Sequence, residues 1–203
     1  MNARRAFALG VAALLVSGGC FNWQHDVTLK GIAFERVRSE PNGYVIGWTK
    51  ADTLVGNRWC KRGWLHLYPN GVAAAFTAAR EIALPRDTIP AGTWVFQEPD
   101  GAITVCAFPR DTEVQGHLCR GSGGPEGVQT ALYADGGLKQ FFPQGTVRID
   151  GVPCSASLFE AGIELHPNGR LKSATLAEVF TREGRTFPKG ARIFLSSDGH
   201  ILP

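Results

Sequence analysis

Six Asn-Gly or Asp-Gly pairs recur at near-regular intervals along this chain of 203 residues, and a seventh, Asp150-Gly151, lies between two of them. Successive pairs are 28, 30, 35, 33 and 30 residues apart, and proline precedes four of the six. Proline presets φ at the first turn position, Asn or Asp takes the second, and Gly accepts the left-handed conformation. A tight β-hairpin with a bulge at the glycine is therefore expected at each pair. The pairs are Asn42-Gly43, Asn70-Gly71, Asp100-Gly101, Asp135-Gly136, Asn168-Gly169 and Asp198-Gly199.

The residues around these turns alternate as they do in strands. Leu65 and Leu67 alternate with His66 and Tyr68 just before one turn, and the third residue past every Asn or Asp is apolar. A period of two indicates one buried and one solvated face. The residues six past the Asn or Asp are also of inward-facing types, namely Trp48, Phe76, Cys106, Phe141 and Ala174.

The hairpin belongs to a larger repeat. Residues 65–103 align on residues 163–201 without a gap, and short second strands ending at glycine follow most turns, as in RDTEVQG and QGTVRIDG. A unit of about 30 residues cannot bury its own apolar face, so its neighbours must stack on it. We predict an all-β fold over residues 31–203, an antiparallel β-hairpin meander or solenoid of about six units. The Ala-rich segment 73–82 is compatible with a helix, but its counterparts in other units favour a strand.

The first residues have the form of an export signal. MNARR is basic, Ala6 to Val16 is apolar, and small residues precede Cys20. The apolar run is shorter than the roughly 20 residues that span a bilayer. This pattern predicts a signal peptide over residues 1–19 and a tether over residues 20–30.

The segment VSGGC resembles the lipobox of bacterial lipoproteins. That resemblance implies cleavage before Cys20, lipid attachment at this cysteine, and anchorage to a bacterial membrane. The residue after Cys20 is Phe21 and not Asp. By the same resemblance this implies the outer membrane, with the domain facing the periplasm or the surface. The alternative is an ordinary signal peptide cleaved near Gly19.

Two units carry a second resemblance. LHPNGRLKSATL, from Leu165 to Leu176, and LYADGGLKQF, from Leu132 to Phe141, resemble MORN-type repeats in the variant form of bacterial secreted proteins and lipoproteins. The spacing of about 30 residues is longer than that of the family's repeat. The resemblance implies an antiparallel β-meander that serves as an adaptor or envelope component and not as a catalyst.

Four cysteines remain besides Cys20. An even number in an exported protein predicts two disulfides. We expect Cys106 to pair with Cys119, which leaves Cys60 with Cys154. The alternative is that some of these cysteines are small buried hydrophobes. The chain has no Cys-x-x-Cys spacing, so a metal site is not expected.

Motifs for catalysis are missing from the sequence. The chain has no Gly-x-Ser-x-Gly motif and no phosphate-binding loop with its lysine, and GSGG at residues 121–124 is expected to be a flexible loop. The one candidate nucleophile pair is Cys119 with His117, and a disulfide would consume the thiol. The net charge of +3 includes Arg4 and Arg5 of the signal, and no basic stripe follows, so nucleic acid is not an expected partner. We expect neither a cofactor nor enzymatic activity.

Five tryptophans crowd the N-terminal half. Trp48, Trp59, Trp64 and Trp94 are candidates for a ligand face on which sugar rings could stack, and core packing is the alternative. The sequence predicts a membrane-anchored, non-catalytic structural or binding module of the bacterial cell envelope. A carbohydrate- or peptidoglycan-binding protein and an unrecognised envelope enzyme are the alternatives. The expected partners are the membrane, through the lipid, and an envelope protein or glycan.

Overall fold

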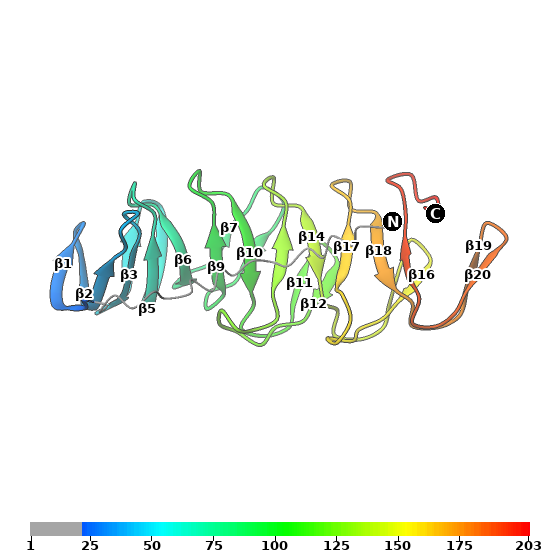
Figure 1. The fold of residues 1–203 in the computed structure, drawn as a ribbon, viewed down its shortest axis with the longest axis horizontal. Helices are drawn as coiled ribbons and strands as arrows, with labels where there is room; N and C mark the ends of the chain where they lie inside the picture. Colours follow the sequence, from blue (N-terminus) through cyan, green and yellow to red (C-terminus); the bar gives the residue numbers. More distant parts are fainter. Residues whose placement is uncertain (1–21) are drawn as a thin grey trace.

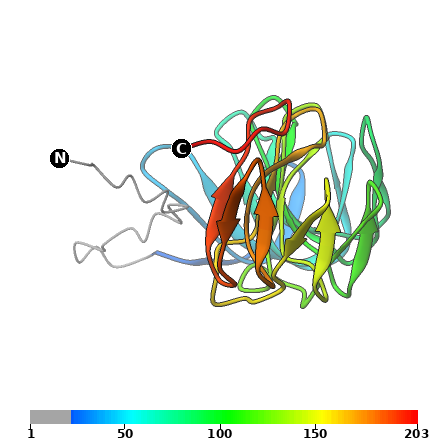
Figure 2. The same cartoon turned by 90° about the vertical axis from the view of Figure 1, so that its right-hand side faces the viewer.

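The computed structural model describes residues 22–203, so the predicted signal peptide and Cys20 lie outside the described residues. The described part contains 21 β-strands and no α-helix, and hence no helix that could cross a membrane. Hairpins follow one another along one axis from the blue N-terminal end to the red C-terminal end (Figure 1). Seen end-on, the red and orange hairpins stand in front of the earlier ones (Figure 2). The predicted all-β hairpin repeat is confirmed.

One long antiparallel sheet runs through the protein. Its path is β1-β2-β3-β5-β6-β9-β10-β13-β14-β17-β18-β21, and β4 pairs with the start of β5. Its strands are β1 (Gln24–Leu29), β2 (Ile32–Ser39), β3 (Val45–Thr49), β4 (Thr53–Val55), β5 (Arg58–Leu67), β6 (Ala73–Ala78), β9 (Trp94–Gln97), β10 (Ile103–Ala107), β13 (Thr130–Leu132), β14 (Leu138–Phe141), β17 (Ile163–Leu165), β18 (Leu171–Thr175) and β21 (Arg192–Phe194).

Short two-stranded hairpins lie between successive long hairpins. They are β7 (Ile82–Ala83) with β8 (Thr88–Ile89), β11 (Thr112–Val114) with β12 (His117–Cys119), β15 (Val147–Ile149) with β16 (Val152–Cys154), and β19 (Phe180–Arg182) with β20 (Arg185–Phe187). Val114, Ile149 and Cys154 of these hairpins belong to the same buried cluster as the inner face of the long sheet. The short hairpins therefore form a second layer that covers the core.

Five of the six regularly spaced Asx-Gly pairs close hairpins between strands of the long sheet, as predicted, and the sixth, Asp198-Gly199, closes a turn flanked by the isolated bridge of Leu195 with Ile201. In each turn the glycine N–H donates to the carbonyl three residues earlier, at 2.8 to 2.9 Å. The six glycines have φ between 79° and 91°. A type I turn followed by a left-handed glycine is the three-residue hairpin loop. The turn residues therefore have a structural role that local backbone chemistry explains.

The short hairpins use a different turn. Gln115-Gly116, Asp150-Gly151 and Glu183-Gly184 have positive φ at both residues, which is the signature of a type I′ turn. Their first side chains also reach the neighbouring long hairpin. Gln115 Oε1 accepts from the Leu138 N–H at 3.0 Å, and Asp150 Oδ2 accepts from the Leu171 N–H at 2.8 Å. Each such bond fixes a short hairpin against the next long one.

A second kind of bond links successive long hairpins. The Tyr68 hydroxyl donates to the Gln97 carbonyl at 2.9 Å, and the Tyr133 hydroxyl donates to the Leu165 carbonyl at 2.8 Å. The pairing of β6 with β9 ends at Phe96, so the Gln97 carbonyl lies beyond the ladder. The hydroxyl therefore satisfies a carbonyl that lies beyond the pairing of β6 with β9.

A bulge decides which side chains face the core. In β5–β6 the partner of Leu67 is Ala73 and that of His66 is Ala75, so one extra residue turns Phe76 inward. The hairpins β9–β10, β13–β14 and β17–β18 show the same shift. The β2–β3 hairpin has no bulge at this point, and its register is continuous from Val45 to Trp48.

The inward prediction for Trp48 is therefore wrong. Gly47 faces the core instead, and a Cβ at that position would lie 2.5 Å from the Phe34 ring. Because neighbours in a strand alternate, Trp48 points to the opposite face of the sheet.

The expected tether over residues 20–30 is shorter than predicted, because Gln24–Leu29 is strand β1 and pairs with β2. The segment around Ala73–Ala78 is a strand, as predicted.

The four cysteines do not pair as predicted. Cys60, Cys106, Cys119 and Cys154 are all free and buried. Cys119 and Cys154 end the second strand of a short hairpin, and Cys60 holds the equivalent position where β4 pairs with the start of β5. Each of these three thiols contacts the carbonyl two residues earlier. They occupy one core position in three different units, so they act as small apolar residues that fill the space between layers.

Candidate binding face

The long sheet has one face on the core and an outer face that no second layer covers. A continuous row of side chains crosses the outer face, with each member directly opposite the next on the adjoining strand. We name its first eight members the outer-face row, namely Arg38, Ile46, His66, Ala75, Phe96, Val105, Ala131 and Gln140. Beyond Gln140 the same pairing continues through Glu164, Ser173 and Phe194. The row spans eight neighbouring strands, which at about 4.8 Å per strand is a length of about 34 Å.

Aromatic rings gather at the N-terminal end of this row. Trp48 and Trp64 face each other across β3 and β5, with ring centroids 5.5 Å apart and planes at 81°. Trp23 lies 6.0 Å from Trp64 with the planes at 53°. The Trp64 side chain remains 41% exposed. The Trp48–Trp64 pair is edge-to-face, which is an arrangement that aromatic pairs prefer, and the Trp23–Trp64 pair is tilted.

Two arginines border the cluster. The Arg36 guanidinium lies 4.9 Å from the centre of the Trp64 ring, and Arg38 lies 5.1 Å from that of Trp23. Arg38 also forms an ion pair with Glu40 at 2.9 Å. Cation–π contacts of this type orient guanidinium groups and leave their edge donors accessible.

A hollow of about 360 Å³ lies beside these groups. We name it the tryptophan hollow. Trp64 and His66 line it from β5, and Trp94 lines it from β9. Burial, together with the charge of Arg38, lowers the pKa of His66, which keeps this ring neutral near pH 7. The lining is completed by Trp23, Arg38, Ile46, Ala75 and Pro125.

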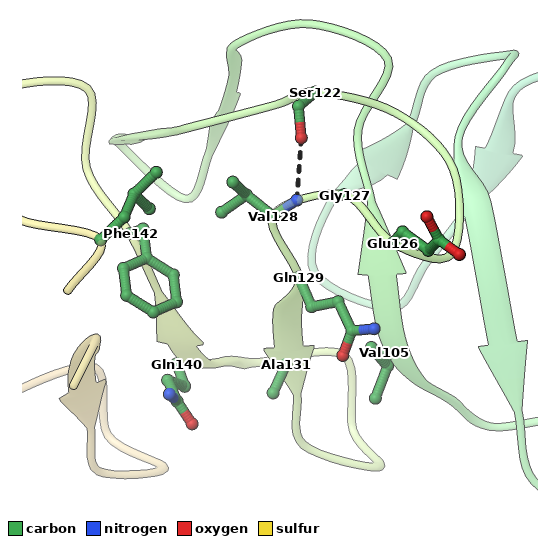
Figure 3. Close-up of a pocket in the computed structure, with 10 residues that line it drawn as sticks. Val105, Ser122, Glu126, Gly127, Val128, Gln129, Ala131, Gln140 and Phe142 are labelled. Carbon is green, nitrogen blue, oxygen red and sulfur yellow. Dashed lines mark hydrogen bonds between the residues drawn. The ribbon is translucent and has the colours of Figure 1, made fainter. Parts of the chain in front are cut away.

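A second hollow of about 430 Å³ lies further along the same face. We name it the loop hollow, because the segment 122–129 arches over it (Figure 3). Val105, Ala131 and Gln140 of the outer-face row form its floor, and Phe142 and Leu158 complete the apolar lining. Pro125 belongs to the tryptophan hollow and Glu126 to the loop hollow, so this loop separates the two.

The loop is held in place by its own hydrogen bonds. The Val128 N–H donates to Ser122 Oγ at 2.9 Å (Figure 3), and Gln129 Nε2 donates to the Pro125 carbonyl at 3.1 Å. A Cβ at Gly127 would lie 2.2 Å from the Gly123 carbonyl oxygen. The glycines therefore let the segment close on itself as a compact wall.

Three of the four predicted ligand-face tryptophans share this face. Trp48, Trp64 and Trp94 lie on the outer face of the long sheet, whereas Trp59 does not. Trp59 is the cross-strand partner of Leu54 on the short-hairpin layer, and Arg80 lies 4.2 Å from the centre of its ring. The prediction that Trp59 belongs to the ligand face is therefore wrong.

The sequence analysis missed four contributors to the site. Trp23 was assigned to the tether, and Arg36, Arg38 and His66 were not linked to the tryptophans. The alternation of side chains along a strand could have linked them. Trp64 and His66 are two residues apart on β5 and share a face, and Arg36 and Arg38 flank the buried Val37 and so share the outer face.

The candidate nucleophile pair has the wrong chemistry for catalysis. Burial raises the pKa of the Cys119 thiol to about 12, whereas a reactive cysteine needs a lowered pKa. The His117 ring packs against Phe141, with centroids 5.1 Å apart. Both side chains therefore contribute to packing.

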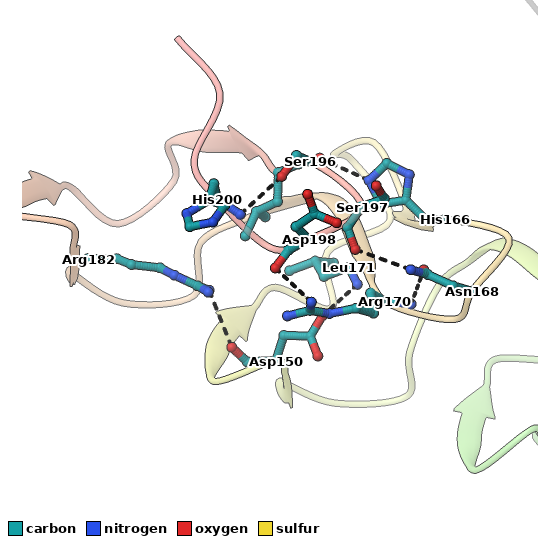
Figure 4. A network of polar contacts seen from close by, with 11 residues as sticks. Asp150, His166, Asn168, Arg170, Leu171, Arg182, Ser196, Ser197, Asp198 and His200 are labelled. Carbon is teal, nitrogen blue, oxygen red and sulfur yellow. Dashed lines mark hydrogen bonds and ion pairs between the residues drawn. The ribbon is translucent and has the colours of Figure 1, made fainter.

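Polar residues also gather at the last turns (Figure 4). Arg170 Nη1 donates to the Asp198 carbonyl at 2.6 Å, and Asn168 Nδ2 donates to the Ser197 carbonyl at 3.1 Å. His200 pairs with Glu183 at 3.1 Å. These groups bond to neighbouring turns, so this cluster joins the final units. Within residues 22–203, no His, Cys, Asp and Glu side chains group as metal ligands do.

Comparison of the sequence with family models found no match, and comparisons with curated proteins and with solved structures found none either.

Proposed function

We propose that the chain is an exported lipoprotein, anchored through Cys20 to the bacterial outer membrane, and that it is a non-catalytic binding module of the cell envelope. Its ligand is a glycan of the envelope, such as peptidoglycan, held on the outer face. The observation that carries this proposal is the tryptophan hollow, where three indole rings and Arg38 meet beside a neutral histidine, with Arg36 stacked on the Trp64 ring.

Sugar rings suit such a surface. The C–H face of a pyranose packs on the flat apolar face of an indole ring, which is a large surface with a polar N–H at its edge. Hydroxyl and carboxylate groups of the sugar then find donors in Arg36 and a donor or acceptor in His66. A concave, mostly apolar site with a few convergent polar groups is the usual form of a small-ligand site.

The lipobox-like segment and the MORN-like units support the envelope location. Trp23 follows Cys20 by three residues in the sequence, so the aromatic end of the sheet is the one nearest the proposed anchor. An anchored domain of this kind would present its binding face close to the membrane surface.

Binding is tested by co-sedimentation of the mature domain with purified, insoluble peptidoglycan. We expect retention, and about a tenfold loss of affinity in Trp64→Ala, which corresponds to about 1.4 kcal/mol. Trp59→Ala is the matched control, because that indole lies on the other layer, and its affinity should equal that of the unmodified protein. Equal losses in both variants, or no retention of the unmodified protein, would contradict the proposal.

Anchorage is tested separately by the intact mass of the protein extracted from membranes. We expect a chain that begins at Cys20 and carries acyl groups. A mass that fits cleavage at another bond without acyl groups would contradict the lipoprotein assignment and would not affect the glycan assignment.

A further inference from the structure

The floors of the two hollows lie along one row of the outer face. Arg38, Ile46, His66 and Ala75 line the tryptophan hollow, and the same row continues through Phe96 to the floor of the loop hollow at Val105, Ala131 and Gln140. The row runs perpendicular to the strands and along the long axis of the protein. Any ligand that follows it must be extended.

We infer that the outer face binds one linear glycan chain that occupies both hollows and runs across the strands. This inference rests on the proposed function and adds the length and direction of the ligand. The tryptophan hollow supplies the stacking surface on β5, and the loop hollow supplies a second subsite whose floor is centred on β13, four strands further along the sheet.

Among the described residues, a polar group without a hydrogen-bond partner lies beside each hollow. Arg36 makes cation–π contacts with Trp23 and Trp64, and within residues 22–203 its guanidinium has no hydrogen-bond or ion-pair partner. The Gln140 amide likewise has no hydrogen-bond partner in the described chain, and it lines the loop hollow (Figure 3). A chain of sugars offers hydroxyl and amide groups at regular intervals, so one molecule can satisfy both groups.

The sheet itself argues against an extended peptide as the occupant. The strands beneath both hollows already pair with each other on either side, so a peptide laid across them would find no backbone partners for its own N–H and C=O groups. Peptides that bind sheets do so by adding a strand at an edge. A glycan needs only side-chain contacts and therefore suits the face.

The loop between the hollows fixes the path. Its tip places Pro125 on one hollow and Glu126 on the other, and the hydrogen bonds of Ser122 and Gln129 hold it closed. A continuous ligand must pass this tip over the stretch of floor formed by Phe96 and Val105.

Isothermal titration with uncharged chito-oligosaccharides, from disaccharide to octasaccharide, tests this inference on the mature domain. We expect affinity to rise by about tenfold once the chain is long enough to reach both hollows. Trp64→Ala should weaken every oligosaccharide, whereas Gln140→Ala should weaken only the long ones. Glu113→Ala, an exposed change on β11 of the other layer, is the control and should change nothing.

The outcomes separate the two proposals. If the disaccharide and the octasaccharide bind equally well and Gln140→Ala has no effect, the extended path is overturned and a single-site glycan module remains. If neither the oligosaccharides nor peptidoglycan bind, the proposed function itself is overturned.

Discussion

The carboxylate of Asp150 accepts a hydrogen bond from the backbone N–H of Leu171 at 2.8 Å. Asp150 is the first residue of the β15–β16 turn and has φ of 51°, and Leu171 begins β18, two residues after Gly169. The side chain that shapes one turn therefore also satisfies a donor in the next hairpin. The equivalent bonds of Gln115 to Leu138 and of Glu183 to Ile201 show that this contact repeats through the C-terminal units.

Asp150→Ala should lower the free energy of unfolding by about 1–3 kcal/mol, because the Leu171 N–H loses its partner and alanine is disfavoured at positive φ. Asp150→Asn keeps an acceptor and tolerates this backbone conformation, so its loss should be clearly smaller. Urea unfolding followed by circular dichroism compares the three proteins. Equal losses in both variants would contradict the role of the bond.

Gly169→Ala isolates the cost of the left-handed turn. Its φ is 81°, and a Cβ added at this position would have nothing within 4 Å, so the penalty is conformational and about 1–2 kcal/mol. Gly145→Ala also enters open space but at an ordinary φ and should be neutral or slightly stabilising. Thermal unfolding of the pair measures the difference, and identical midpoints would overturn this explanation of the repeated turn.

Tyr68→Phe should cost about 0.5–1.5 kcal/mol, because the buried hydroxyl satisfies the Gln97 carbonyl, which lies beyond the pairing of β6 with β9. Tyr44→Phe is the matched control. The Tyr44 ring packs 5.3 Å from that of Tyr68, and within the described chain its hydroxyl bonds to no other residue. Denaturant titration should show a lower midpoint for Tyr68→Phe alone.

Stability should fall in alkaline solution under reducing conditions. Burial raises the pKa of Cys60 and Cys119 to about 12 and that of Cys154 to about 11, whereas unfolded thiols ionise at pKa near 8.5. Above that pH the unfolded chain loses protons that the folded chain keeps, so its free energy falls relative to the native state.

The thiol contribution is measured by urea unfolding at pH 8, 9 and 10 with a reductant. Each buried thiol should steepen the decline of the unfolding free energy by up to about 1.4 kcal/mol per pH unit. Cys119→Ala should remove the contribution of one thiol. A parallel pH dependence in the variant would show that Cys119 ionises as easily when folded as when unfolded.

Acid should also destabilise the protein through two histidines. Burial lowers the pKa of His66, with a further contribution from the charge of Arg38, and burial lowers that of His117. As pH falls below about 6.5, the unfolded chain gains protons that the folded chain does not take up, so the native state loses stability. His66→Gln should reduce the loss between pH 7 and pH 5, measured by urea unfolding, and an unchanged loss would contradict the assignment.

The sequence predicted the candidate site only in part. It supplied the tryptophans, but Trp59 sits on the other layer and Trp23 belongs to the sheet margin and not to a tether. Chain order could not link Trp64 with Arg36, because these residues meet through the pairing of three strands, β2, β3 and β5. The cysteines show the same limit, since equivalent core positions in different units do not pair.

The sequence by itself determined the regularly spaced turns, because positive φ at a glycine after Asn or Asp is a local property of the backbone, and these turns located five hairpins of the long sheet. Alternation near the turns then predicted most of the core. Only the tertiary structure decided which face Trp48 takes, because one bulged residue reverses every side chain beyond it, and the β2–β3 hairpin lacks the bulge that β5–β6 has. The outer-face row likewise exists only once neighbouring hairpins are in register.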